Sequence, residues 1–217
     1  MDISVSGVGV LDKSVRLLEL ILERPRNLAE LVEETGWARA TTYRLACALE
    51  VHGLARRDGD GRFAPGYRLL SFGRAAAVGV PLADLADPVL VALRDATGES
   101  SQLYLRQGEV RVCVAAVESA HGLRTIVPLG AQLTMERGSA ARVLRGEVDS
   151  EGWVASVGER EPGVASVSAP VRDDTGAVIA AVSVSGPIGR IGAEPGPAHG
   201  PAVRDAADEL SRQLAHR

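Results

Sequence analysis

The chain has 217 residues, of which 46% are hydrophobic and 24% charged, and its formal net charge at pH 7 is −4. These proportions are typical of a globular protein with one large or two small domains. The net charge alone gives no sign of a nucleic-acid-binding protein. No apolar run is long enough to span a bilayer and no signal segment precedes the first helical pattern, so we expect a cytoplasmic protein. The two cysteines, Cys47 and Cys113, lack the spacing of a disulfide framework or a zinc site, so we expect no metal.

The N-terminal part of the chain has the spacing of three helices followed by a hairpin. Residues 1–9 are polar and glycine-rich, which predicts a loose arm. Apolar residues then recur at helical intervals over residues 11–24, and Pro25 ends that helix. Asn27 is a suitable N-cap for a second, short helix, which Gly36 ends. A third helix is expected over residues 37–52, with Gly53 just past its end.

The next segment, residues 54–63, contains the turn sequence DGDG between short β-prone flanks, which predicts a hairpin. Two helices joined by a glycine turn and followed by a hairpin are the pattern of a winged helix-turn-helix, whose second helix enters the DNA major groove. Basic residues gather on that helix and on the hairpin, whereas the preceding helix is acidic. The sequence therefore places the positive charge where a DNA-binding face requires it.

The candidate DNA contacts lie in the first turns of the second helix of this motif and on the hairpin. Arginine can pair with guanine through two hydrogen bonds, and hydroxyl groups can contact phosphate. The arginines of the hairpin are better placed for phosphates than for bases. Alternatively, Thr41 caps the helix, Tyr43 packs against the first helix of the motif, and the arginines are merely solvated. The candidates are Arg39, Ala40, Thr41, Thr42, Tyr43, Arg44, Arg56, Arg57 and Arg62.

Downstream, the pattern changes to helices alternating with strands. A linker helix is expected over residues 66–78, with an apolar face of Leu69, Leu70 and Phe72, and the best domain boundary is at residues 79–81. This divides the chain into 1–65, 66–80 and 81–217. In the last part we expect an antiparallel sheet with helices packed on it, that is, an α+β domain. Its helices are expected at 82–97, 138–144 and 202–215, its strands at 101–106, 110–118, 123–127, 164–171 and 177–185, with a further strand at Trp153 and an ordered turn at 193–201.

Catalytic motifs are missing from the sequence. None of the four histidines lies in an HExxH motif or beside a convincing nucleophile, and no GxSxG, Walker or GxGxxG motif occurs. We therefore expect neither an enzyme nor a cofactor.

Two groups of motifs carry a family resemblance. The N-terminal stretches GVGVLDKSVRLLELI and LAELVEETGWARATTYRLACALEVHGLARRD, and the later stretches GSAARVL, SVGEREPGVASVSAPV and VIAAVSVSGPIGRI, resemble the IclR family of bacterial transcriptional regulators. The resemblance covers nearly the whole chain and looks closest to actinobacterial members linked to amino-acid metabolism. It implies a winged helix-turn-helix, a linker helix and an effector-binding domain. It also implies homodimers or tetramers on palindromic double-stranded operator DNA, regulated by a small and often carboxylate-bearing metabolite.

The resemblance also implies a set of effector-binding residues. One wall of the pocket would be formed by Met135 and by a turn at a helix N-terminus, whose backbone N–H groups can hold an anion. Serines on two strands would face the ligand from the sheet, and the alternation of Ser183 with Ser185 puts both hydroxyls on one side of their strand. Alternatively, these serines are solvated at an edge. The implied residues are Met135, Gly138, Ser139, Ala140, Ser166, Ser183 and Ser185.

The chain departs from the family pattern at two places. Residues 145–152 replace a longer helical segment, which removes part of the pocket's cover. Val157-Gly158 stands where relatives often have an acid, so Glu159 or Glu161 would have to supply that polar contact. Two other functions remain open at this point: a ligand-independent DNA-binding dimer with a degenerate sensor domain, and a small-molecule enzyme that carries a winged helix.

Overall fold

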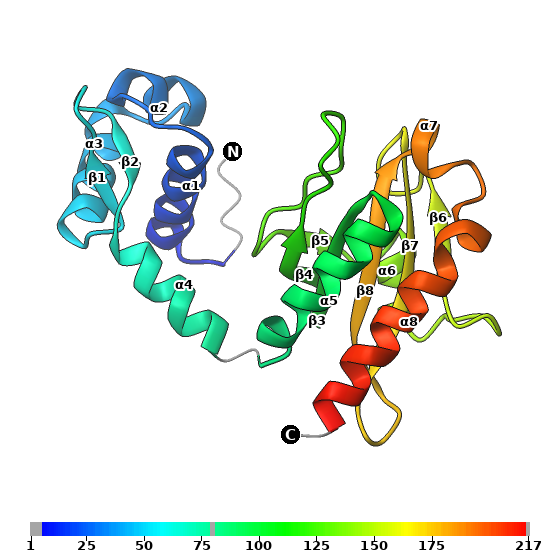
Figure 1. Cartoon of the computed structure of the whole chain (residues 1–217). Helices are drawn as coiled ribbons and strands as arrows, with labels where there is room; N and C mark the ends of the chain where they lie inside the picture. The colour runs from blue at the N-terminus through cyan, green and yellow to red at the C-terminus, as the bar shows by residue number, and fades with distance from the viewer. Residues whose placement is uncertain (1–5, 79–80, 216–217) are drawn as a thin grey trace. The chain divides into compact units, whose positions relative to one another are not determined.

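The computed structural model describes residues 6–78 and 81–215 (Figure 1). Contacts between residues divide the chain into two compact units, residues 1–79 and 80–217. Residues 1–5 of the expected arm and residues 79 and 80 of the expected domain boundary lie outside the described residues. Among the helices that the structure describes, none is long and apolar enough to cross a membrane.

The N-terminal unit has the expected helices and hairpin. Helices α1 (Gly9–Glu23), α2 (Leu28–Thr35) and α3 (Arg39–Val51) precede strands β1 (Ala55–Arg57) and β2 (Phe63–Pro65), and α4 (Arg68–Val78) follows. The two strands pair antiparallel, with Arg56 opposite Ala64. The core of this unit is formed by apolar residues of α1, α2, α3 and the hairpin, among them Leu17, Ile21, Leu31, Leu49 and Phe63. The winged helix-turn-helix prediction is thus confirmed.

Local hydrogen bonds explain why the short helix α2 begins and ends where it does. The Asn27 side chain accepts a hydrogen bond from the Glu30 backbone N–H at 3.0 Å, and the Glu30 carboxylate accepts one from the Asn27 N–H at 2.7 Å. This reciprocal capping box satisfies two N–H groups that the helix itself leaves without partners. At the other end, Gly36 adopts a left-handed conformation with φ 68° and donates to the Val32 carbonyl.

The apolar face predicted for the linker helix α4 is partly exposed. It begins at Arg68 rather than at residue 66, and the side chains of Leu70 and Phe72 are exposed, as is that of Tyr67 just before the helix. The hydrophobic spacing of a helix shows which side is apolar, but it does not show that the same unit buries that side.

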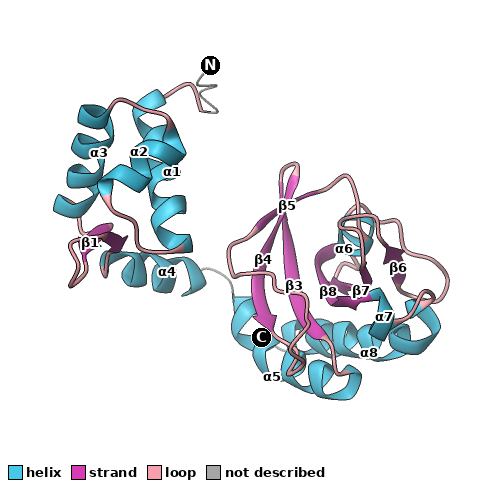
Figure 2. Ribbon diagram, turned by 90° about the horizontal axis from the view of Figure 1, so that it is seen from above, coloured by secondary structure: helices cyan, strands magenta, loops and turns pink. Residues whose placement is uncertain are grey.

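The C-terminal unit is a six-stranded antiparallel sheet with helices on both faces (Figure 2). The strand order is β5-β4-β3-β8-β7-β6. Helices α5 and α8 pack on one face, and α6 packs on the other. The elements are α5 (Pro81–Thr97), β3 (Ser100–Gln107), β4 (Val110–Val117), β5 (Gln132–Thr134), α6 (Ser139–Leu144), β6 (Val154–Val157), β7 (Val164–Arg172), β8 (Val178–Pro187), α7 (Ile188–Ile191) and α8 (Pro195–Ala215).

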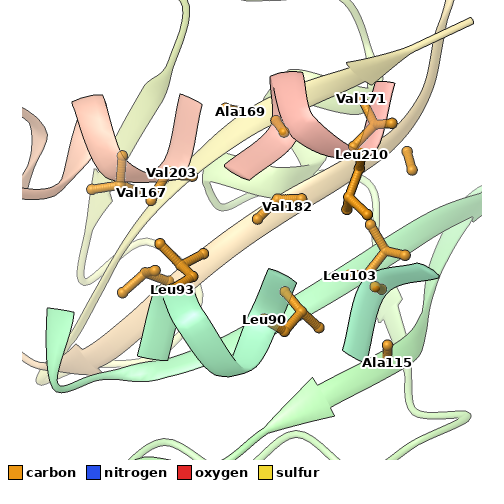
Figure 3. Packing of buried hydrophobic residues seen from close by; sticks show 14 of the residues in the cluster. Leu90, Leu93, Leu103, Ala115, Val167, Ala169, Val171, Val182, Val203 and Leu210 are labelled. Atoms are coloured by element: carbon orange, nitrogen blue, oxygen red, sulfur yellow. The ribbon is translucent and has the colours of Figure 1, made fainter. Parts of the chain in front are cut away.

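The alternation of side chains along β7 and β8 makes the two faces of the sheet chemically different. Val167 and Val171 on β7 and Val182 on β8 lie on the face beneath α5 and α8, where Leu90 and Leu210 cover them (Figure 3). Burial of a leucine or valine side chain stabilises a fold by about 1.5–3 kcal/mol, so this face holds the main core. The residues between them, many of them serines, point to the face of α6.

Two expectations for the C-terminal unit are wrong. Residues 123–127 form no strand, because the backbone of Cys113 on β4 bonds to Gly130 and Ala131 instead, and β5 pairs with β4 farther along. The terminal helix begins at Pro195 rather than at 202, so the glycine- and proline-rich stretch is helical and Pro201 lies inside the helix. The Trp153 ring packs on this part of α8: a Cβ at Gly200 would lie 2.3 Å from a ring carbon. The glycine therefore serves close packing and not a turn.

Candidate DNA-binding face and ligand pocket

Helix α3 presents a polar face to solvent because its apolar residues pack on the rest of the unit. Ala46 and Leu49 are buried in the core, while Arg39, Ala40, Tyr43 and Arg44 are exposed. Within the part of the chain that the structure describes, neither Arg39 nor Arg44 forms an ion pair. The exposed face therefore carries two arginines that no carboxylate of the described residues neutralises.

The structure corrects the interpretation of both threonines. Thr42 is fully buried, and its hydroxyl donates to the Ala38 carbonyl at 3.3 Å, so the expectation of a DNA contact is wrong. It lies on the inward side of the helix, two residues before the outward-facing Arg44. Thr41 is half-buried and is not the N-cap, because Ala38 has that position.

Tyr43 remains available on the surface. Its side chain is 50% exposed, so packing against the rest of the unit leaves half of it accessible. Cys47, one turn farther along α3, forms a hydrogen bond with the phenol and raises the pKa of Tyr43. The hydroxyl is therefore protonated at neutral pH and can donate to a phosphate oxygen.

The three arginines of the wing interact with their own chain. Arg57 lies 3.4 Å from the Glu50 carboxylate and donates to the Gly61 carbonyl at 3.0 Å. Arg62 pairs more loosely with Glu30, at 3.6 Å. Arg56 is half-buried, with its guanidinium 5.2 Å from the centre of the Tyr67 ring. The wing is thus less positive than its sequence indicates.

The second candidate site is a cavity on the α6 face of the sheet, with a volume of about 20 Å³. A space of this size holds little more than one water molecule. Its walls come from α6 and the turn before it, from five strands and from the segment between β6 and β7. The lining residues are Tyr104, Arg111, Gly138, Ser139, Ala140, Ser156, Arg160, Val164, Ser166, Ser183 and Ser185.

Serine hydroxyls cross the strands in two adjacent rows. In one row, Ser166 on β7 lies opposite Ser156 on β6 and Ser185 on β8. In the other row, Ser168 lies opposite Ser183. Ser139 of α6 joins the two rows by hydrogen bonds to Ser166 and Ser168.

Ser139 ties α6 to the sheet by short hydrogen bonds. Its hydroxyl lies 2.7 Å from that of Ser166 and 2.8 Å from that of Ser168, which in turn donates to Ser183 at 2.9 Å. Buried hydroxyls need such partners because an unpaired polar group in the interior is costly. The chain of hydroxyls therefore fixes the positions of the groups that line the cavity.

Arg111 of β4 is the cation of the cavity. Its side chain is almost fully buried, and one terminal nitrogen, Nη1, donates to the carbonyl oxygens of Thr134 and Arg137. Burial lowers the pKa of Arg111, and the nearby Arg160 lowers it further. Its Nε is buried and has no hydrogen-bond partner in the described residues.

The comparisons with known proteins match both units. The family model for the IclR helix-turn-helix domain matches residues 10–59, and the model for the bacterial transcriptional regulator IclR C-terminal domain matches residues 146–212. Together they match more than half of the chain. This chain belongs to the IclR family of transcriptional regulators.

Individual relatives agree with this assignment over almost the full length. The HTH-type transcriptional regulator KipR of Bacillus subtilis is 26% identical and aligns with 94% of this chain and 96% of its own. The IclR structure of Thermotoga maritima has a TM-score of 0.76 at 22% identity, covering 95% of this chain and 98% of that one. An IclR homologue of Microbacterium hydrocarbonoxydans, complexed with 4-hydroxybenzoate, has a TM-score of 0.73 at 19% identity, covering 94% and 98%.

The IclR resemblance had implied seven pocket residues, and six of them line the cavity; the exception is Met135. Met135 is buried in a second apolar cluster with Tyr104 and Cys113 and is not among the residues that line the cavity. The expected anion site at the backbone of the turn is wrong in part. The Gly138 N–H already donates to Glu159 at 3.0 Å, and the helix that follows has only six residues.

Sequence reasoning missed five lining residues, of which Arg111 and Arg160 bear charge. Alternation in the strand EVRVCVAAV puts Val110, Val112 and Val114 on one side and Arg111 on the other, so the pattern did not indicate that Arg111 is buried. Among the described residues, no group of three or more His, Cys, Asp and Glu side chains is placed to hold a metal ion.

Proposed function

We propose that this IclR-family chain binds a palindromic operator as a homodimer, alone or paired into a tetramer, and that a small carboxylate in the cavity changes its DNA affinity. Residues 1–65 bind DNA, 66–80 form the linker, and 81–217 bind the effector. The protein acts in the cytoplasm, where its operator is, and has no catalytic activity of its own. The observation that carries the proposal is the exposed face of α3 with its unpaired arginines.

On the operator, the N-terminal turns of α3 lie in the major groove. Arg39 and Arg44 contact guanine edges or phosphates, Ala40 allows close approach, and Tyr43 donates to the backbone. Arg56, Arg57 and Arg62 contribute phosphate contacts. The wing contacts are weaker than those of α3, since Arg57 and Arg62 must share their charge with acidic neighbours.

The exposed apolar residues of the N-terminal unit support a dimer. On α1, Leu11, Val15 and Leu22 are exposed at helical spacing, and on α4 Leu70 and Phe72 are exposed. Several large apolar side chains exposed on the same helix are a sign of an interaction surface. A dimer that covers these residues presents two α3 helices to the two halves of a palindrome.

Regulation follows if the ligand binds one arrangement of the dimer better than another. A ligand shifts such an equilibrium only by its difference in affinity for the two states. Helix α4 and the residues that follow it connect the two units and would carry the rearrangement. The small volume of the cavity favours one alternative function, that of a ligand-independent DNA-binding dimer with a degenerate sensor domain.

The decisive experiment compares two double variants of the full chain on DNA from upstream of its own gene. Arg39→Ala with Arg44→Ala should weaken binding in a mobility-shift assay by at least about 30-fold, since each contact contributes about 1–3 kcal/mol. Arg106→Ala with Arg212→Ala removes the same charge from the other unit and should bind within about twofold of the unchanged protein. Circular dichroism checks that both are folded. Equal operator binding by the two double variants would refute the assignment of α3 as the DNA-binding helix.

A further titration separates the regulated from the unregulated protein. A set of small carboxylic acids is added to the protein–DNA complex and to the free protein. A saturable binding heat that Ser183→Ala weakens, together with a shift in DNA affinity, supports regulation. DNA binding without any such response supports the degenerate-sensor alternative.

A further inference from the structure

Arg111 is a buried cation. Only 3% of the residue is exposed, and within the described residues it forms no ion pair. Nη1 donates to two backbone carbonyls, while Nε has no acceptor. The Nε–Nη2 edge of a guanidinium can hold a planar carboxylate through two parallel hydrogen bonds. That edge is not used by any carboxylate of the described residues.

Three acids near the cavity already have partners other than Arg111. Glu159 accepts the hydrogen bond from the Gly138 N–H, Glu147 pairs with Arg145 at 2.7 Å, and Glu161 pairs with Arg160 at 3.5 Å. Arg160 and Arg145 lower the pKa of Arg111, and Tyr104, which raises it, is a neutral phenol at neutral pH because burial raises its own pKa. The local field therefore favours an anion beside Arg111.

The opposite wall supplies neutral hydrogen-bonding groups. Ser156, Ser166, Ser183 and Ser185 line the cavity from three adjacent strands. A hydroxyl can both donate and accept, so the row fits a ligand oxygen that is either a carbonyl or an alcohol. Because the cavity measures about 20 Å³, entry of an acid requires lining side chains to move, and Arg160, whose side chain is 21% exposed, is the more exposed of the two arginines there.

We propose that Arg111 is the specificity-determining residue of this cavity: its guanidinium binds the carboxylate of a small polar acid, and the serine row binds an oxygen substituent of that acid. This inference rests on the proposed function of the cavity as the effector site. A planar carboxylate matches the Nε–Nη2 edge of the guanidinium, and the hydroxyl-lined cavity of about 20 Å³ has to widen less for a small acid than for an aromatic one.

The test uses the full chain and three pairs of probes that differ in charge but hardly in shape. These are acetate and acetamide, lactate and lactamide, and pyruvate and pyruvamide, titrated by calorimetry at constant ionic strength. We expect saturable binding of lactate, pyruvate or both, and at least tenfold weaker binding of the matching amide. Benzoate should bind at least tenfold more weakly than the better small acid. Failure of all three carboxylates, or equal affinity for acid and amide, overturns the inference.

Arg111→Met and Arg111→Lys then separate ligand binding from support of the fold. We expect Arg111→Met to lose at least 30-fold in carboxylate affinity while its unfolding temperature without ligand stays the same or rises, because a buried unpaired charge is replaced by an apolar side chain. Arg111→Lys keeps the charge but not the planar fork, and should lose about tenfold. Arg106→Met, on the exposed end of β3, is the matched control and should bind as the unchanged protein does.

The results with these variants distinguish a ligand-binding role of Arg111 from a purely structural one. Undiminished carboxylate binding by Arg111→Met overturns the inference. If that variant does not fold, Arg111→Lys decides: weaker binding at an unchanged unfolding temperature supports the inference, and unchanged binding overturns it. Operator binding is measured on the same samples. If a neutral metabolite alone releases the protein from DNA, the inference fails and the proposed function stands. If no operator is bound, the proposed function fails whatever the acids do.

Discussion

Removal of one acidic side chain from the DNA-binding unit should increase operator affinity. Glu50, in the last turn of α3, holds the Arg57 guanidinium at 3.4 Å, and the two side chains are 35% and 37% exposed. Glu50→Gln keeps the size of the side chain and removes its charge. Arg57 stays in place, because it also donates to the Gly61 carbonyl and stacks over the Phe63 ring with 3.8 Å to its centre. The released positive charge then lies on the wing.

The expected gain in operator affinity follows from the exposure of the Glu50–Arg57 ion pair. A pair that is about one-third exposed contributes about 0–1 kcal/mol, and a phosphate contact by Arg57 has to offset that contribution. Glu50→Gln should therefore lower the dissociation constant by up to about fivefold for each half-site, since about 1.4 kcal/mol corresponds to tenfold. If Arg57 gains one full phosphate contact, the slope of log K against log salt becomes steeper by about 0.9 for each protomer.

Fluorescence anisotropy with a labelled operator, measured at several salt concentrations, gives both quantities. Asp95→Asn is the control, because it removes the same charge from an exposed ion pair with Arg94 in the C-terminal unit. It should leave affinity and salt slope unchanged. An unchanged or weaker affinity of Glu50→Gln, with the protein folded, would show that Arg57 does not face the DNA.

Two further predictions concern the fold. Gly200→Ala should lower the free energy of unfolding by up to about 2 kcal/mol. The new Cβ would lie 2.3 Å from the Trp153 ring, and such overpacking costs about 1–3 kcal/mol, whereas alanine is favoured over glycine inside a helix by about 1 kcal/mol. In a Trp153→Leu background, urea unfolding should show no such loss. Burial raises the pKa of the Cys113 thiol to about 12. Thiol labelling at pH 8 should therefore modify Cys47 at once and Cys113 only after unfolding. Rapid labelling of both thiols in the native protein would refute the burial of Cys113.

The helices and strands that obey a simple period could be predicted from the sequence. Helices α1, α2 and α3 have apolar residues at helical spacing and recognisable ends at Pro25, Gly36 and Gly53. The hairpins and the long strands β7 and β8 alternate regularly. Residues 123–127 alternate as well, but their partner strand uses its hydrogen bonds elsewhere. Which strands pair is a property of the whole sheet, and local pattern does not specify it.

Residues of the candidate sites could be predicted where the sequence pattern shows on which side of a helix or strand a residue lies. Alternation placed Ser183 and Ser185 together on the cavity side of β8, and the structure has them there. Thr42 was misjudged because the first turns of α3 were taken as a block, although a helix turns by about 100° per residue and one position in this block points inward. Arg111 was missed because it is far along the chain from the serines, and β3 lies between its strand and β8, so only the folded domain shows that its side chain lines the same cavity.

The two faces of the sheet explain how such a domain can change its ligand without losing its fold. On β7 and β8 the core residues, such as Val167 and Val182, alternate with cavity residues, such as Ser166 and Ser183. A substitution on one side leaves the packing under α5 and α8 almost untouched, because neighbouring side chains in a strand point to opposite faces. The exception is Ser168, whose hydroxyl is fully buried between Ser139 and Ser183. Its loss leaves partners unsatisfied at a cost of about 1–3 kcal/mol, so changes of specificity should spare this position and fall on the residues around it.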